Sequence, residues 1–160
     1  MNDDMPIKKK MKMRMEMGMK MKDVVVRIRS EQSENGEKPT KIEQISDGRL
    51  FKCGDAWNLT YKEVQESGLG DSFTTIMMHE NGMVSMDRIG ENKMKMEFVE
   101  GRKHIARMDS PNGIMDIGIL TNKVKIKIDE NGGRLNLSYI VVLNDEYPVQ
   151  TKMTMLVTAK

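Results

Sequence analysis

The chain has 160 residues, enough for one domain with a sizeable core, and its hydrophobic content of 38% is ordinary for a globular protein. Its 26 basic and 24 acidic side chains give a formal charge of +2. The first 22 residues alone carry +4, which leaves the remaining chain at −2. A basic footprint is therefore missing from most of the chain, and we expect no nucleic-acid partner.

Cys53 is the single cysteine, which excludes a disulfide framework and a cysteine-based zinc site. No apolar run approaches the roughly 18–20 residues of a membrane span. The basic N-terminal segment also lacks the continuous apolar stretch of a signal peptide. We therefore predict a cytoplasmic protein, a monomer or homodimer, with no membrane partner, no metal and no cofactor.

Residues 1–22 form a low-complexity segment that holds eight of the 18 methionines, six of them alternating from Met11 to Met21. We treat this segment as an N-terminal extension and assign residues 23–160 to a β-barrel domain. One interpretation of the extension is a flexible or strand-extending tail. A second is a translated ribosome-binding region, with the true start at Met19 or Met21. A third is a soft-metal site, since thioethers suit Cu(I), but no His or Cys accompanies them.

Short runs that alternate apolar and polar residues continue from Asp23 onward, and turn signals recur every 8–12 residues. No segment shows the stripe of an amphipathic helix. This pattern predicts an all-β fold with little or no helix: a single antiparallel meander barrel, calycin- or lipocalin-like, of about 8–10 strands. The expected strands include 23–30, 40–46, 49–53, 57–63, 72–79, three short runs within 83–108, 114–120, 123–128, 135–143 and 149–158. Expected turns include Asp47-Gly48, Asn81-Gly82, 131–133 and Asn144-Asp145.

Arg88 shares the period-2 face of Val84 and Met86, which places a long cation among apolar neighbours. A buried cation needs a partner. One hypothesis is that Arg88 pairs with Glu63 or a tyrosine and plugs the barrel. Another is that its guanidinium holds the anionic head of a small apolar ligand. A third places Arg88 in solvent at a strand end. The orientation of the strand that carries His104 is ambiguous, because Ile105 on its opposite face is also apolar. With that reservation for His104, inward parity selects the other candidate ligand-binding residues, which are Trp57, Tyr61, Glu63, His104 and Tyr139.

Catalysis has little support, because His79 and His104 are the only histidines and no serine or cysteine has the context of a nucleophile elbow. We predict no catalytic residues. The stripe Lys123, Lys125 and Lys127 is typical of a solvated strand face. Most of the later methionines are interpreted as core filler.

The order of several short motifs between residues 23 and 157 resembles the YwiB-like family of small bacterial proteins. This resemblance implies a calycin-like barrel, but the family has no established activity, so it assigns no functional residue. Met108 and Ser110 depart from the aromatic and threonine that the family favours there. The motifs are Tyr61-Lys62-Glu63, Gly68-Leu69-Gly70, Thr74-Thr75, Val84, Arg88-x-Gly90, Met96-x-Phe98, Gly101-Arg102-Lys103-His104, Pro111-x-Gly113, Thr121, Gly133 and Ser138-Tyr139.

The sequence thus favours a non-enzymatic binding module that takes a small amphipathic or anionic molecule inside the barrel. The first alternative is an interaction protein with a solid core that acts through its outer face. The second is an enzyme that uses Glu63, Arg88 and His104.

Overall fold

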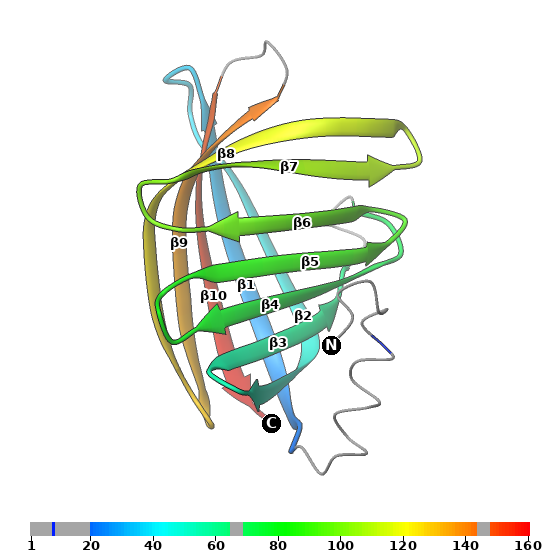
Figure 1. Ribbon diagram of the computed structural model, residues 1–160, viewed down its shortest axis with the longest axis vertical. Coiled ribbons are helices and arrows are strands. Elements are labelled where there is room, and N and C mark those ends of the chain that lie inside the picture. The colour runs from blue at the N-terminus through cyan, green and yellow to red at the C-terminus, as the bar shows by residue number, and fades with distance from the viewer. Residues whose placement is uncertain (1–7, 9–19, 65–68, 144–147) are drawn as a thin grey trace.

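The computed structural model describes residues 8, 20–64, 69–143 and 148–160, which form a ten-stranded barrel (Figure 1). The predicted turn at Asn144-Asp145 lies outside the described residues, as does the part of the methionine-rich segment from Met11 to Met19. The strands are β1 (Lys22–Glu34), β2 (Thr40–Cys53), β3 (Ala56–Lys62), β4 (Ser72–His79), β5 (Val84–Gly90), β6 (Lys93–Phe98), β7 (Lys103–Ser110), β8 (Gly113–Asp129), β9 (Gly132–Leu143) and β10 (Val149–Ala159).

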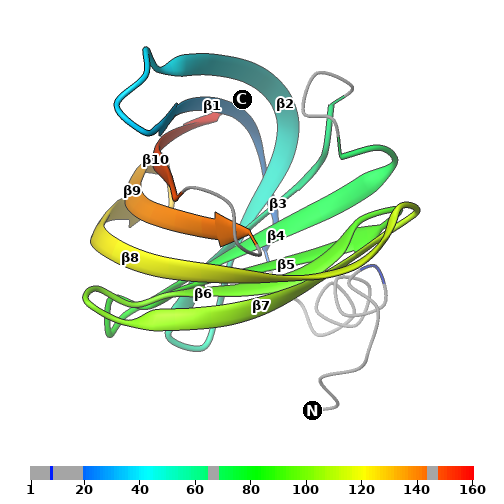
Figure 2. The ribbon, with the colours of Figure 1, turned by 90° about the horizontal axis from the view of Figure 1, so that it is seen from above.

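Each strand pairs antiparallel with the next along the chain, and β1 pairs with β10 to close the ring (Figure 2). The predicted all-β antiparallel barrel is confirmed, with a strand number at the upper end of the expected range. No helix in the described part of the chain is long and apolar enough to cross a membrane.

Two predicted boundaries are wrong. Asp47-Gly48 is not a turn but lies inside β2, which runs unbroken to Cys53. A Cβ on Gly48 would lie 2.9 Å from both the Thr60 carbonyl oxygen and Val26 Cγ2, so this glycine serves close packing within the barrel. The predicted strands 114–120 and 123–128 are a single strand, β8, because a β-bulge between Thr121 and Lys123 keeps the ladder going.

The alternation of side chains decides what fills the barrel. Inward apolar residues from all ten strands form one core, to which β2 contributes only from its second half. The largest fully buried side chains of this core include Phe98, Leu59 and Ile119. The orientation of β7, which the sequence left ambiguous, follows from two neighbours: Ala106 is buried, whereas Ile105 is 67% exposed. His104 therefore lies on the inward face of β7.

The wall of the barrel is paired unevenly. β1 and β10 are in register from Val24↔Ala159 to Glu34↔Val149. In contrast, β6 and β7 pair only at Lys93↔Asp109 and Met94↔Met108, and we call the unpaired stretch between them the seam. A second gap lies beyond the first residue of β7, Lys103, which pairs with Leu120. The part of β8 from Lys123 to Asp129 pairs with β9 alone, and we call it the free edge of β8.

Candidate ligand-binding site

The sheet register brings polar side chains from three neighbouring strands into one row on the inner wall. Tyr61 on β3 pairs with Thr74 on β4, and Thr74 pairs with Arg88 on β5. All three are buried, with Arg88 only 7% exposed. Glu63 follows β3 and reaches the same group. The row exists because each of these residues falls on the inward parity of its strand.

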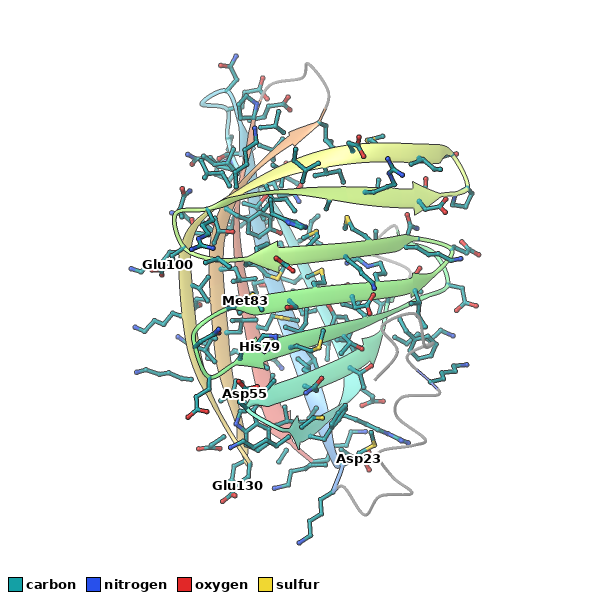
Figure 3. All side chains as sticks on the ribbon, in the orientation of Figure 1. Asp23, Asp55, His79, Met83, Glu100 and Glu130 are labelled. Carbon is teal, nitrogen blue, oxygen red and sulfur yellow. The ribbon has the colours of Figure 1, made fainter. Side chains whose placement is uncertain are left out.

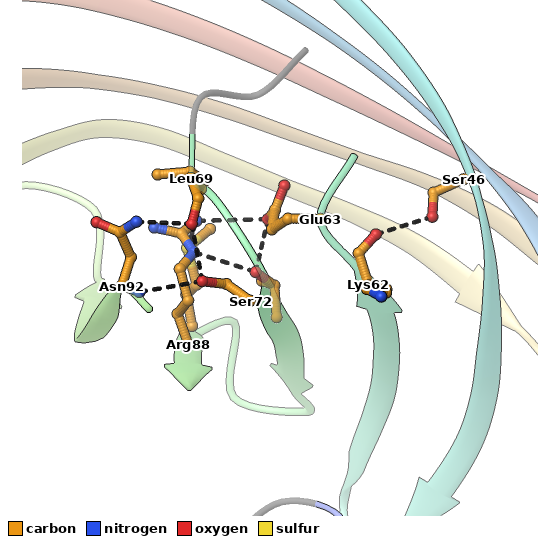
Figure 4. Close-up of polar contacts among 9 residues, drawn as sticks. Ser46, Lys62, Glu63, Leu69, Ser72, Arg88 and Asn92 are labelled. Carbon is orange, nitrogen blue, oxygen red and sulfur yellow. Dashed lines mark hydrogen bonds and ion pairs between the residues drawn. The ribbon is translucent and has the colours of Figure 1, made fainter. Parts of the chain in front are cut away.

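Arg88 and Glu63 form a buried ion pair (Figure 4). The Arg88 Nη2 atom lies 3.6 Å from Glu63 Oε1, and both side chains are at least nine-tenths buried. Thr74 links the two, since its hydroxyl donates to Glu63 Oε1 at 2.6 Å and accepts from Arg88 Nε at 3.2 Å. Nη2 also lies 3.6 Å from the Met86 sulfur. The predicted pairing of Arg88 with Glu63 is thus what the structure contains.

Two tyrosines enclose this ion pair. Burial raises the pKa of Tyr139 to about 12, although the nearby Arg88 charge opposes the rise. The pKa of Tyr61 is raised further, first by burial and then by the negative charge of Glu63. The Tyr139 ring also packs on Phe98, with ring centroids 4.9 Å apart. Both phenols are therefore neutral hydrogen-bonding groups at physiological pH.

Some buried oxygen atoms near this group have no partner among the described residues. They are Glu63 Oε2 and the hydroxyls of Thr121 and Thr151. Thr121 and Thr151 flank Tyr139 on the two adjacent strands, β8 and β10. An unpaired buried polar atom costs about 1–3 kcal/mol, so these atoms mark places where a bound polar group would be stabilised.

The seam opens the wall beside Arg88. A groove of about 590 Å³ lies there, lined by Arg88 and Met94 from the β5–β6 side and by His104, Ile105 and Ala106 from β7. The register continues the row beyond Arg88 through Met94, then Met108 on β7 and Met115 on β8. All three methionines are half-buried. Arg88 is therefore reached both by the seam and by a line of flexible apolar side chains.

The turn after β5 is held by the loop before β4. The Asn92 side chain donates to the Leu69 carbonyl at 2.6 Å, and its backbone N–H donates to the Ser72 hydroxyl at 3.1 Å (Figure 4). Gly90 has φ +114°, and a Cβ there would meet the Asp71 carbonyl oxygen. Only glycine fits this close approach, which fixes the end of β5 two residues beyond Arg88.

The structure brings four of the six predicted ligand-binding residues together: Tyr61, Glu63, Arg88 and Tyr139. His104 joins Arg88 in lining the seam groove. Trp57 does not belong to this group, because it lies beside a different hollow next to the free edge of β8. Within the described chain, no group of three His, Cys, Asp or Glu side chains is placed to hold a metal ion.

Sequence reasoning missed Thr74, the residue that joins the ion pair. The signal was present, since Ile76 and Met78 are inward apolar residues of the same strand and Thr74 shares their parity. Thr121 and Thr151 were also missed as members of the inner wall. Threonine is common on both faces of strands, so parity alone did not distinguish these three residues.

A closed ten-stranded antiparallel barrel, with an arginine–glutamate pair buried inside it, defines this chain as a small β-barrel protein. Residues 26–155 match the family model of a domain of unknown function, DUF1934, and the chain belongs to that family. It is 25% identical over 131 residues to the uncharacterized β-barrel protein YwiB of Bacillus subtilis (strain 168). The aligned residues cover 82% of this chain and 89% of that protein.

A solved structure shares the fold of this chain. The crystal structure of the ywiB protein from Bacillus subtilis superimposes with a TM-score of 0.80 at 22% identity, covering 91% of this chain and 98% of that one. This likeness shows the fold. The predicted resemblance to the YwiB-like family is confirmed.

Proposed function

We propose that this barrel binds a small amphipathic molecule with a carboxylate or phosphate head, which enters through the seam and places its head beside Arg88. The observation that carries the proposal is the coincidence of three features at one place. The wall is unpaired at the seam, a groove of about 590 Å³ opens there, and the one charged residue of β5 that faces inward lines it.

Arg88 keeps hydrogen-bonding capacity for such a head. A guanidinium carries five N–H donors, and the contacts within the described residues engage Nε and Nη2. The Nη1 atom makes none of them. Its two donors suit an oxyanion, which a planar fork binds more specifically than a point charge does.

The methionine row gives the apolar tail a place to lie. Met94, Met108 and Met115 follow Arg88 in register and are half-buried. Unbranched thioether side chains adapt to ligands of different shape. A head at Arg88 and a tail along this row would match an amphipathic molecule.

Methionine-methyl NMR offers a direct test. The protein, labelled with ¹³C at the methionine methyl groups, is titrated with dodecanoate and, as a matched control, with dodecanol. We expect the methyl signals of Met94, Met108 and Met115 to move with dodecanoate at lower concentrations than with dodecanol. Equal responses to dodecanoate and dodecanol would show that the site does not recognise an anionic head. No response at these methyl groups would overturn the proposal.

Two variants test the role of Arg88. Arg88→Lys keeps the charge and loses the fork, so dodecanoate should bind more weakly while the fold is kept. Arg88→Met combined with Glu63→Leu removes both charges and should abolish the preference for dodecanoate over dodecanol.

Native mass spectrometry of protein purified gently from a bacterial host would then identify the natural ligand as a mass of a few hundred daltons lost on denaturation.

An interaction protein with a filled barrel is the second candidate. It is favoured by the buried Arg88–Glu63 pair and by the core that occupies the barrel. If no amphipathic probe moves the methionine signals, this candidate takes precedence, and Arg88 is a structural group.

A further inference from the structure

The free edge of β8 exposes main-chain hydrogen-bonding groups. The Val124 N–H does not point to β9 but donates a hydrogen bond to the Glu100 carboxylate at 2.8 Å. In an antiparallel strand alternate residues direct their N–H and C=O groups to the same side. The N–H and C=O groups of Ile126 and Ile128 therefore also point away from β9. No strand of the described chain covers them.

A cleft of about 440 Å³ borders this edge. Val124, Ile126 and Ile128 line one side, all half-buried. Across from them lie the ends of β3 and β4, which contribute Trp57 and Met78. Figure 3 shows the turns on that side as a column beside β8, with Glu100, Met83, His79 and Asp55 one below another. The lining also includes charged side chains, Asp55 and Glu80 among them, so the cleft combines an open strand edge with a mixed apolar and charged lining.

The outer face of the free edge is strongly basic. Lys123, Lys125 and Lys127 are exposed on it, and the exposed Arg134 of β9 lies opposite Lys127 in register. Like charges placed opposite each other on a sheet repel. None of these four cations forms an ion pair with another described residue. Carboxylates on an adjacent strand would relieve this repulsion.

From these three observations we infer that the free edge of β8 is a docking site for an extended, acidic segment of a partner protein, which adds to the sheet as a strand. Its backbone pairs with Ile126 and Ile128. Its inward side chains are apolar and contact Trp57 and Met78, while its outward side chains are carboxylates above the lysines. This is β-strand addition, in which main-chain bonds supply affinity and alternate side chains supply specificity.

The segment from Met11 to Met21 of this chain is a poorer occupant. It alternates methionine with residues that are mainly cationic, Lys12, Arg14 and Lys20 among them. That charge pattern is the opposite of the one the lysines favour. The argument therefore points to another protein as the source of the strand.

Hydrogen exchange and fluorescence test the site on the full chain. Trp57 is the single tryptophan, so its emission reports on this cleft. The probe is a blocked heptapeptide that alternates valine and glutamate. We expect a blue shift of Trp57 emission and slowing of exchange at the Ile126 and Ile128 amides by about tenfold or more, with little change at Lys125 and Lys127, whose amides face β9.

Two control peptides separate the parts of the inference. A peptide with lysine in place of glutamate should bind more weakly, and a glutamate peptide N-methylated at the amides that face β8 should not protect Ile126 and Ile128. Unchanged exchange with the parent peptide would overturn the inference. So would equal binding of the lysine or the N-methylated peptide.

Charge reversal on the protein gives a complementary test. Lys123→Glu, Lys125→Glu and Lys127→Glu together should weaken the acidic peptide roughly tenfold or more and improve the lysine peptide, because three favourable rim contacts become repulsive. The matched control reverses three exposed lysines elsewhere, Lys38, Lys41 and Lys152. If both triple variants lose affinity equally, net charge and not the β8 edge governs binding, and the inference fails.

Discussion

Two parts of the barrel wall differ in how fully they are paired. β1, β9 and β10 are held by ladders of ten or more residue pairs each, from Val24↔Ala159 on one side to Val149↔Val141 on the other. Around β6 and β7 the ladder shrinks to two pairs, and from Lys123 onward β8 pairs with β9 alone. The two hollows considered above border these incomplete stretches.

The contrast teaches where a small barrel can offer access. A fully paired wall with a packed interior leaves no route inward, whereas an interrupted ladder leaves both space and unsatisfied main-chain groups. The polar row containing Arg88 ends at the interrupted stretch. Our two proposals, ligand entry at the seam and strand addition at the free edge of β8, use these incomplete stretches, and the continuous wall is the scaffold.

The buried ion pair gives the largest expected effect. Arg88→Met should lower the free energy of unfolding by about 3–5 kcal/mol, because Glu63 is left charged and buried without its partner. Urea denaturation measures the loss. Glu63→Leu in the same chain should restore most of it, since the uncompensated charge is then gone. Wild-type stability in Arg88→Met alone would contradict a stabilising pair.

A surface pair provides the matched control for this prediction. Lys62 and Asp71 lie 3.3 Å apart, but their side chains are 61% and 71% exposed. Lys62→Met should change the free energy of unfolding by less than about 1 kcal/mol. Equal losses in the two variants would mean that burial is not what distinguishes the inner row.

High pH should destabilise the barrel through its buried tyrosines. The pKa of Tyr139 is about 12 in the folded state, above its ordinary 10.0. A raised pKa stabilises the fold fully below pH 10, and that contribution disappears as pH rises to about 12. Tyr139 alone accounts for roughly 3 kcal/mol over this window. Urea denaturation from pH 9 to 12 should show the decline, and Tyr139→Phe should make it shallower. A decline of equal steepness in Tyr139→Phe would assign it to other groups.

Two buried threonines sharpen the comparison between connected and unconnected polar groups. Thr74→Val removes the hydroxyl that bonds both Glu63 and Arg88, and should cost about 1–3 kcal/mol. Thr151→Val removes a buried hydroxyl with no partner in the described residues. We expect that variant to be neutral or slightly stabilised, by less than about 1 kcal/mol. The reverse order in thermal or urea unfolding would contradict the hydrogen-bond assignment.

The smallest effect concerns local opening. Native-state hydrogen exchange should be faster for amides that face the seam on β6 and β7 than for amides of β1 and β10, because fewer main-chain bonds must break there. Mass spectrometry of peptic fragments can compare the two regions. Uniform protection around the barrel would mean that the seam is as firmly closed as the rest of the wall.

The sequence predicted much of this fold because strand parity is a local property. Alternation alone placed Arg88, Glu63 and Tyr61 on the inner wall, and the polar partner of Arg88 followed from the cost of a buried charge. It did not place Trp57, which shares their parity but sits at another height along the barrel. Height depends on the registers of all intervening strands, and no local pattern encodes them.

The seam and the free edge of β8 also could not be predicted from local sequence patterns. The strength of the β6–β7 ladder depends on how the barrel closes over its whole circumference. The Asp47-Gly48 error has a related cause, since glycine serves turns and close strand packing alike. Only the position of Val26 and Thr60 against Gly48 distinguishes the two uses.

The pairing of β1 with β10 has a consequence for synthesis. The ring joins the first and last of its ten strands, so the ladder that completes it links residues more than a hundred positions apart. Until β10 emerges from the ribosome, one edge of β1 has no native neighbour. Such late, non-local closure slows folding and exposes a strand edge to association with other chains. A circular permutant that joins β10 to β1 through a short linker and opens elsewhere would make this contact local, and we expect it to fold faster than the natural order of strands.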